Sequence, residues 1–275
     1  MKPTKDQLSI FDIVINHDVI PEVLPSKPEI KATPKIIQPS DKNLCPYKIP
    51  EVDEIIKQIE KAAYRVNKSK LISDVFECGA LAISNLVDKP QYDAREQRYL
   101  EIIKTYKPDE QKLLSDIFAM IFALCSSVVY DDGVFNDYLG EIFMRCNQAN
   151  SAIGQVFTPY HISKLMAKCT ITDSDITKNE VVTINDPCCG GGVMLLAALD
   201  VLKNDYGVNY AYNCFMDAGD VDIRCVHMTY MQLSLAGVPA IIKHQNALTR
   251  ELWSVWKTPA FIFQYLRFHK YANFN

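Results

Sequence analysis

The sequence predicts an α/β fold in which a parallel sheet is preceded by an α-helical domain. Between residues 51 and 150, apolar residues recur at steps of three and four, which is the period of amphipathic helices. From 151 to 275, short β-branched runs alternate with apolar stretches of helical length. Strands and helices that alternate in this way form a parallel sheet with helices on its faces. Residues 1–50 hold eight of the 14 prolines and show neither period, so we expect a flexible arm there.

The composition is typical of a soluble globular protein. Of 275 residues, 48% are hydrophobic and 23% are charged, which is enough for one domain with a real core or for one full domain and a smaller one. Lys and Arg number 29 against 33 Asp and Glu, and the net charge is −4. This balance gives no sign of a strongly basic nucleic-acid binder, so any contact with DNA needs a local patch.

The chain is expected to be cytoplasmic. Its nine cysteines form no C-x-x-C pair, which fits neither a disulfide framework nor a zinc ribbon. The first ten residues do not have the apolar stretch of a signal peptide. The most apolar run, residues 117–125, is well short of the ~20 residues that a membrane-spanning helix requires.

Local patterns place the helices of the first domain. An apolar stripe over 55–66 predicts one helix, and Asp93 with Glu96 has the spacing of a capping box at the start of another. A helix over about 109–130 is apolar nearly all round in its second half, so we expect it at the centre of a bundle. A further helix is expected over about 135–146.

The second domain is predicted to alternate strands and helices. The expected strands are 181–185, 212–216, 239–243 and 260–265, and the expected helices are 193–203 and 223–235.

A glycine-rich turn, N-D-P-C-C-G-G-G over 185–192, joins the first strand to its helix. Glycines there let the backbone approach a ligand closely and leave helix amides free to donate. A nucleotide-like ligand fits such a turn, and Asp220, with Asp222 beside it, follows the second strand where an acid would hold ribose hydroxyls. A tight packing turn without a ligand is the alternative. The turn is neither G-x-G-x-x-G nor a P-loop, which disfavours NAD and ATP.

Two motifs in order resemble those of one enzyme family. Residues 186–192 resemble the D-P-x-C-G-S/T-G motif of N6-adenine DNA methyltransferases, in particular the modification subunits of type I restriction systems. Residues 154–159, G-Q-V-F-T-P, resemble their G-Q-F/Y-F-T-P motif, and 219–223 resemble G-x-E/D-I-D. The similarity extends over about 132–259 and includes the segments 137–144 and 228–238.

The resemblance implies a class I, Rossmann-like methyltransferase sheet with S-adenosylmethionine as cofactor. The F-T-P residues would line its methionine end, the 186–192 turn would wrap the amino acid and ribose, and Asp220 would accept from the ribose hydroxyls. Asn246 takes the place of an Asp that contacts the adenine amino group. The implied cofactor-binding residues are Gln155, Phe157, Thr158, Pro159, Asp186, Pro187, Cys188, Gly190, Gly192, Asp220, Val221 and Asn246. DNA is the implied substrate, and a specificity subunit or a second copy of the chain is an implied partner.

The chain departs from the family at its catalytic motif, [N/D/S]-P-P-[Y/F/W], which does not occur in the sequence. The nearest fragment is T-P-A-F over 258–261, and the sixteen residues after Pro259 leave no room for later strands. Either another polypeptide completes a site for methyl transfer to adenine N6, or the chain is a catalytically inactive cofactor-binding or scaffold module. A methyltransferase acting on RNA or a small molecule is a more distant alternative. Catalytic residues therefore stay unassigned.

Two other features carry less information. His227, His244 and His269 have no metal-type spacing, so we predict no metal site. Between 243 and 270 there are five Lys and Arg but only one Glu, and aromatic residues are interleaved with them. This segment either contacts phosphates and bases or forms a partly buried amphipathic end of the fold.

Overall fold

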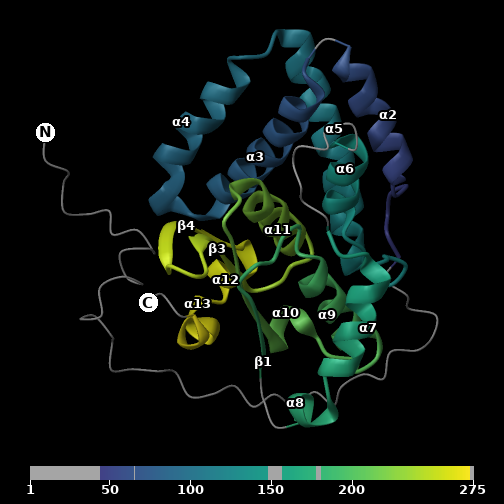
Figure 1. Cartoon of the computed structure of the whole chain (residues 1–275), viewed down its shortest axis with the longest axis vertical. Helices are drawn as coiled ribbons and strands as arrows, with labels where there is room; N and C mark the ends of the chain where they lie inside the picture. Colours follow the sequence, from purple (N-terminus) through teal and green to yellow (C-terminus); the bar gives the residue numbers. More distant parts are fainter. Residues whose placement is uncertain (1–43, 65, 148–156, 178–180, 273–275) are drawn as a thin grey trace, which may run out of the picture. The chain divides into compact units, whose positions relative to one another are not determined.

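A computed structural model describes residues 44–64, 66–147, 157–177 and 181–272 (Figure 1). The predicted arm therefore lies outside the described residues as far as residue 43. Its last part is described and is tied to the helices: Cys45 N donates to Asp132 Oδ1 at 2.9 Å, and the Tyr47 hydroxyl lies 2.8 Å from Ser126 Oγ.

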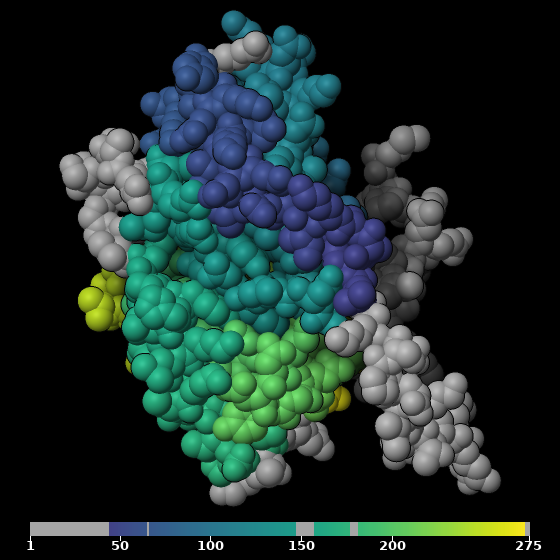
Figure 2. Space-filling model, turned by 90° about the vertical axis from the view of Figure 1, so that its right-hand side faces the viewer, coloured from purple at the N-terminus to yellow at the C-terminus, as the bar shows by residue number. Residues whose placement is uncertain are grey.

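Helices make up the first half of the described chain, as the apolar period predicts. They are α2 (Val52–Ala63), α3 (Lys68–Val87), η1 (Lys89–Gln91), α4 (Tyr92–Ile103), α5 (Pro108–Ser126), η2 (Ser127–Val129), α6 (Tyr138–Asn147), α7 (Tyr160–Thr170) and α8 (Asp173–Thr177). In Figures 1 and 2, α2 lies alongside α5 and α6.

Two local predictions for these helices are wrong. The central helix is α3, most of which is buried, whereas α5 leaves Phe122 46% exposed. A long apolar run can still present one face to solvent, because small and aromatic residues there need not all pack. Helix α4 begins after Gln91 without a capping box, and Glu96 instead accepts a hydrogen bond from Asn85 Nδ2 at 2.8 Å.

Four strands follow, in the order β1-β2-β3-β4: β1 (Val182–Asp186), β2 (Cys214–Asp220), β3 (Ala240–Asn246) and β4 (Glu251–Lys257). The first three are parallel, and β4 is antiparallel to β3. Between them lie α9 (Val193–Asn204), α10 (Tyr210–Asn213) and α11 (Ile223–Leu235), and after them α12 (Pro259–Phe263), α13 (Tyr265–Phe268) and η4 (His269–Tyr271). The predicted mixed fold with a mainly parallel sheet is thus confirmed.

The strand predicted over 260–265 is wrong. Pro259 stands at the first position of α12, and the Thr258 hydroxyl caps this helix by accepting from Phe261 N. Proline at this position and threonine before it favour a helix start. The extra strand is instead β4, where Trp253, Val255 and other strand formers occur.

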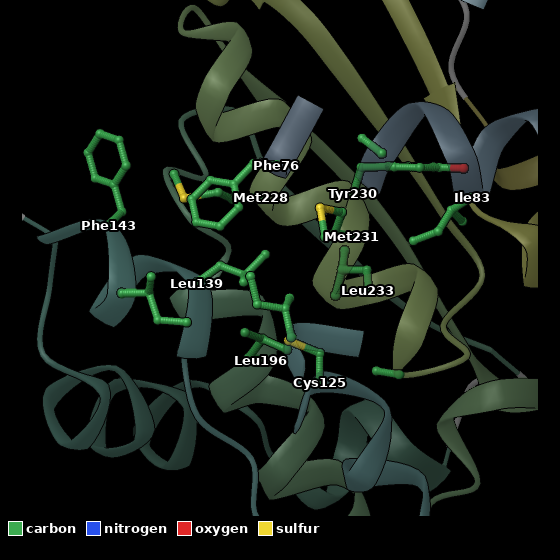
Figure 3. Packing of buried hydrophobic residues seen from close by; sticks show 14 of the residues in the cluster. Phe76, Ile83, Cys125, Leu139, Phe143, Leu196, Met228, Tyr230, Met231 and Leu233 are labelled. Carbon is green, nitrogen blue, oxygen red and sulfur yellow. The ribbon is translucent and has the colours of Figure 1, made fainter. Parts of the chain in front are cut away.

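Successive side chains along each strand point to opposite faces of the sheet. Val182, Met216 and Ile242 face the core shared with α9, α11 and the helices of the first half. Phe215 and Ile241 pack on the other face against Phe261 of α12 and further aromatic residues. Figure 3 shows the shared core, where side chains from α3, α5, α6, α9 and α11 meet. The described helices and strands lie in one compact unit, and the predicted division at residue 150 stays a prediction.

One helix among the described residues, Pro108–Val129, is long and apolar enough to cross a membrane by length and composition. Its Leu114, Ile117, Ile121 and Leu124 are buried in the shared core. A core helix of a soluble protein meets the same criterion, so this helix is weak evidence for a membrane span.

His227 makes the stability of the fold depend on pH. It is 4% exposed and lies edge-on to Trp256, with 4.9 Å between ring centroids. Burial, and then the positive charges of His244 and Arg95, lower its pKa from 6.5 to about 3. The unfolded chain therefore takes up a proton below pH 6.5 that the folded chain does not. The stabilisation is complete above pH 6.5 and is lost as the pH falls towards 3.

We predict that His227→Gln removes this dependence. Between pH 3.5 and 6, the unfolding free energy of the wild type should rise more steeply with pH than that of the variant, by about 1.4 kcal/mol per pH unit. Urea unfolding of both proteins at several pH values measures the difference. Parallel stability curves would show that the buried histidine does not cause it.

Candidate functional site

The glycine turn lies between the first strand and its helix, as the sequence predicts. After β1 ends at Asp186, the chain reaches α9 with φ of 53° at Gly190 and 94° at Gly192. Residues with a side chain rarely adopt these angles. A Cβ at Gly190 would lie 3.3 Å from the Phe157 ring, and one at Gly192 would lie 3.0 Å from Thr229 Oγ1. Both glycines are therefore required by backbone conformation and by close contacts.

Asp220, the last residue of β2, holds this turn. Its Oδ2 accepts from Gly190 N at 2.9 Å, and its Oδ1 accepts from Asp222 N at 2.9 Å. Next to it, Cys189 N donates to the carbonyl of Gly219 at 2.9 Å. The carboxylate is 9% exposed. The ends of β1 and β2 are thus joined around one nearly buried carboxylate.

A second carboxylate, Asp186, stands on the β1 side of the turn. Its Oδ1 accepts from Cys188 N at 3.1 Å. Burial raises the pKa of Asp186; the bond from Cys188 N opposes this, and the nearby charge of Asp220 adds a smaller rise. Two carboxylates around an open backbone turn can accept from hydroxyl or ammonium groups of a ligand.

The F-T-P segment meets the turn in space. The Phe157 ring lies against Gly190 and 5.8 Å from the ring centroid of Phe143. Phe157, Thr158 and Pro159 line a cavity of about 220 Å³. Two segments some thirty residues apart in sequence thus come together, as the motifs predict. Gln155 lies outside the described residues.

A buried polar cluster under the turn is a feature that the sequence analysis did not assign to the site. Gln232 Nε2 donates to the carbonyl of Gly191 at 2.7 Å and to Asp137 Oδ1 at 2.8 Å. Thr229 Oγ1 donates to the carbonyl of Gly190 at 2.9 Å. The sequence does contain a sign of this cluster, because Thr229 and Gln232 are polar residues in a helix that is buried and mainly apolar.

A further cavity, of about 580 Å³, runs along the other edge of β1. Asn185 and Asp186 line it together with residues of α7 and α9. Among the described residues β1 pairs only with β2, so β1 is an outer strand of the sheet and this cavity lies along its unpaired side.

Asn246 ends β3 at the same edge as Asp186 and Asp220, but its side chain serves the following turn. Its Oδ1 accepts from Leu248 N at 3.0 Å and from Thr249 N at 3.2 Å. These two bonds occupy both lone pairs of the oxygen. The geometry does not favour the predicted contact with an adenine amino group, which stays a prediction.

Thr258 lies away from the candidate site. It is fully buried beside Ala240 at the start of β3, so it belongs to the opposite edge of the sheet. Its hydroxyl donates to the carbonyl of Val238 at 2.6 Å and accepts from Ala240 N at 2.9 Å. The T-P-A-F fragment is therefore part of the core and of a helix cap.

The basic segment 243–270 is in part built into the fold, whereas Arg250, Arg267 and Lys270 are exposed. Lys243 pairs with Asp217 at 2.9 Å, and Arg267 Nε donates to the carbonyl of Tyr212 at 2.8 Å. Trp256 and Phe268 are buried. These contacts favour the amphipathic end over a surface made to bind nucleic acid.

The residues predicted to bind a cofactor thus gather at the carboxyl edge of the sheet. This holds for Phe157, Thr158, Pro159, Asp186, Pro187, Cys188, Gly190, Gly192, Asp220 and Val221. The family model for N-6 DNA methylase matches residues 132–270, just over half of the 275 residues. Comparison with curated proteins gives no match. The match covers α6, the F-T-P segment, the glycine turn and all four strands. This chain belongs to the N-6 DNA methylase family.

Proposed function

We propose that this chain binds S-adenosylmethionine at the carboxyl edge of β1 and β2, on a class I, Rossmann-like sheet. The observation that carries the proposal is the meeting of Phe157, the left-handed glycines and the Asp220 carboxylate around one turn. A Cβ at Gly190 would meet the Phe157 ring and one at Gly192 would meet Thr229, so glycine is what allows this turn its conformation. A turn without side chains at these positions is suited to a ligand that approaches its backbone.

The described residues fit the cofactor by their chemistry. Each oxygen of Asp220 accepts one backbone bond and keeps a lone pair for a ribose hydroxyl. Phe157, Thr158 and Pro159 would line the methionine end, and the turn from Asp186 to Gly192 would surround the amino acid and ribose. When bound, S-adenosylmethionine supplies a methyl group on a sulfonium centre.

The proposed substrate is DNA, with transfer of the methyl group to adenine N6, and the proposed setting is a cytoplasmic restriction-modification system. Positioning of the methyl donor and the adenine amino group would account for most of the rate acceleration. The N/D/S-P-P-Y/F/W motif is absent from the sequence, and Thr258 is buried at the other edge of the sheet. Transfer therefore requires that another segment or subunit supplies the groups that hold the flipped base.

A second candidate is a cofactor-binding or scaffold module of such a complex that transfers no methyl group. The burial of Thr258 favours this candidate for the chain by itself, because none of the described residues at the candidate site then replaces the catalytic motif. Detection of N6-methyladenine in DNA after incubation with the chain and S-adenosylmethionine would decide for the methyltransferase.

Calorimetric titration tests the cofactor proposal. The wild type should bind S-adenosylmethionine saturably, and Asp220→Ala should bind at least ~100-fold more weakly. Bonds to a charged group contribute about 1.5–3 kcal/mol each, and this variant loses its bonds to the ligand and to the turn. Absence of binding by the folded wild type would refute the proposal.

Asp205→Asn is the matched control. This aspartate follows α9 and pairs with Lys168 at 2.8 Å on the surface, away from the turn. The substitution removes one negative charge, as Asp220→Ala does, and should leave the affinity unchanged.

A further inference from the structure

Asp137 has an unusual position beside the glycine turn. It is 6% exposed, precedes α6, and its Oδ1 accepts from Gly140 N at 2.9 Å and from Gln232 Nε2 at 2.8 Å. Oδ2 lies between two glycines: a Cβ would be 2.0 Å from it at Gly140 and 3.0 Å at Gly191. Among the described residues no donor reaches Oδ2. Within the described part of the chain, this oxygen is therefore a nearly buried acceptor without a hydrogen-bond partner.

The cavity that Asp137 lines favours a positively charged group. This is the cavity of about 220 Å³ that also contains Phe157, Thr158 and Pro159. Asp137 and Glu141 contribute two carboxyl groups to its lining, and no lysine, arginine or histidine lines it among the described residues. Glu141 is paired with Arg145 at 3.0 Å, whereas Asp137 has no cationic partner in the described ranges. A buried carboxylate without a counter-charge is costly, and an entering cation would offset that cost.

Hydrogen bonds and ring contacts connect this cavity to the glycine turn. Gln232 Nε2 bridges Asp137 and the carbonyl of Gly191, and Phe157 contacts Gly190 while it lines the cavity. A ligand whose ribose lies at Asp220 would direct its other end past Gly190 towards this space.

We infer that Asp137 binds the α-ammonium group of the methionine end of S-adenosylmethionine through Oδ2. The inference rests on the proposed function and adds a specificity residue to it. An ammonium group donates three hydrogen bonds and carries the charge that the cavity lining does not supply. Burial raises the pKa of Asp137, as expected for a carboxyl group whose counter-charge arrives with the ligand. Asp137 would thus select ligands that carry the amino-acid end.

Asp137→Asn tests the inference with two probes. Asparagine caps helices as well as aspartate does, and its carbonyl oxygen can still accept from Gly140 N and Gln232 Nε2. S-adenosylhomocysteine carries the α-ammonium group, whereas 5′-methylthioadenosine has the same nucleoside without the amino acid. We expect the variant to bind S-adenosylhomocysteine 10- to 100-fold more weakly than the wild type, and 5′-methylthioadenosine within threefold of it. Calorimetry on the full chain measures all four affinities.

The other outcomes overturn the inference in distinguishable ways. An equal loss for both probes would show that Asp137 only shapes the turn, and no loss for either would show that it does not contact the ligand. Glu141→Gln removes the second carboxylate of the same cavity. A loss as large as that of Asp137→Asn would mean that a general negative field, and not a direct contact, is responsible. A wild type that binds neither probe would refute the proposed function together with this inference.

Discussion

Gly192→Val should abolish cofactor binding and lower the unfolding free energy by about 2–5 kcal/mol. Gly192 has φ of 94° directly before α9, and a β-branched residue is strained there. Its Cβ would also lie 3.0 Å from Thr229 Oγ1 and 3.3 Å from Thr229 Cγ2, so the turn has to move away from α11. Movement of the turn would displace Gly190 N from Asp220. Urea unfolding and titration with S-adenosylmethionine measure the two effects.

Gly207→Val separates backbone strain from crowding. Gly207 also has a positive φ, 64°, but a Cβ there would meet nothing within 4 Å. This control should lose only the ~1–2 kcal/mol that a left-handed conformation costs a residue with a side chain, and its affinity for the cofactor should not change. If Gly192→Val were no more damaging than Gly207→Val, the contact with Thr229 would not shape the site.

The sequence predicts those parts of the fold and site that depend on local conformation. Glycines between a strand and a helix predict an open turn without knowledge of the neighbours, and the turn between β1 and α9 has positive φ at Gly190 and Gly192. The helix predicted over 223–235 has the bounds of α11. Alternation of strand and helix also fixed which strand ends share an edge, so Asp186 and Asp220 could be placed together before any contact was known.

Features that depend on tertiary packing were not accessible in this way. Asp93 and Glu96 have capping-box spacing, but the long-range contact with Asn85 determines where Glu96 lies. The side chains of Asp137 and Gln232 meet across 95 positions of sequence, and no local pattern predicts that pairing. The strand expected over 260–265 failed because its aromatic residues suit either a strand or the face of a short helix, and the cap at Thr258 decided between them.

Arg95→Ala should lower the unfolding free energy by about 3–5 kcal/mol, because it leaves a buried carboxylate without its partner. Arg95 is 7% exposed, and its Nη1 donates to Asp88 Oδ2 at 2.9 Å and to Ser84 Oγ. Its Nη2 donates to the carbonyl of Val255 at 2.8 Å, and its guanidinium carbon lies 4.0 Å from the centre of the Trp256 ring. One side chain thereby joins α3, α4 and β4. Urea unfolding, followed by tryptophan fluorescence, measures the loss.

The double variant Arg95→Ala/Asp88→Asn identifies the cause. Asp88 is 6% exposed, so its charge is costly once the guanidinium is gone. If that unpaired charge dominates, the added Asp88→Asn should recover about 1–3 kcal/mol of the stability that Arg95→Ala loses, although it removes another polar contact. If the double variant is as unstable as Arg95→Ala or less stable, the loss comes instead from the packing on Trp256 and the bond to Val255. Those two contacts link the helical half to the hairpin that follows the candidate site. In that case the same substitution should also weaken cofactor binding, whereas loss of the ion pair alone should leave the affinity unchanged.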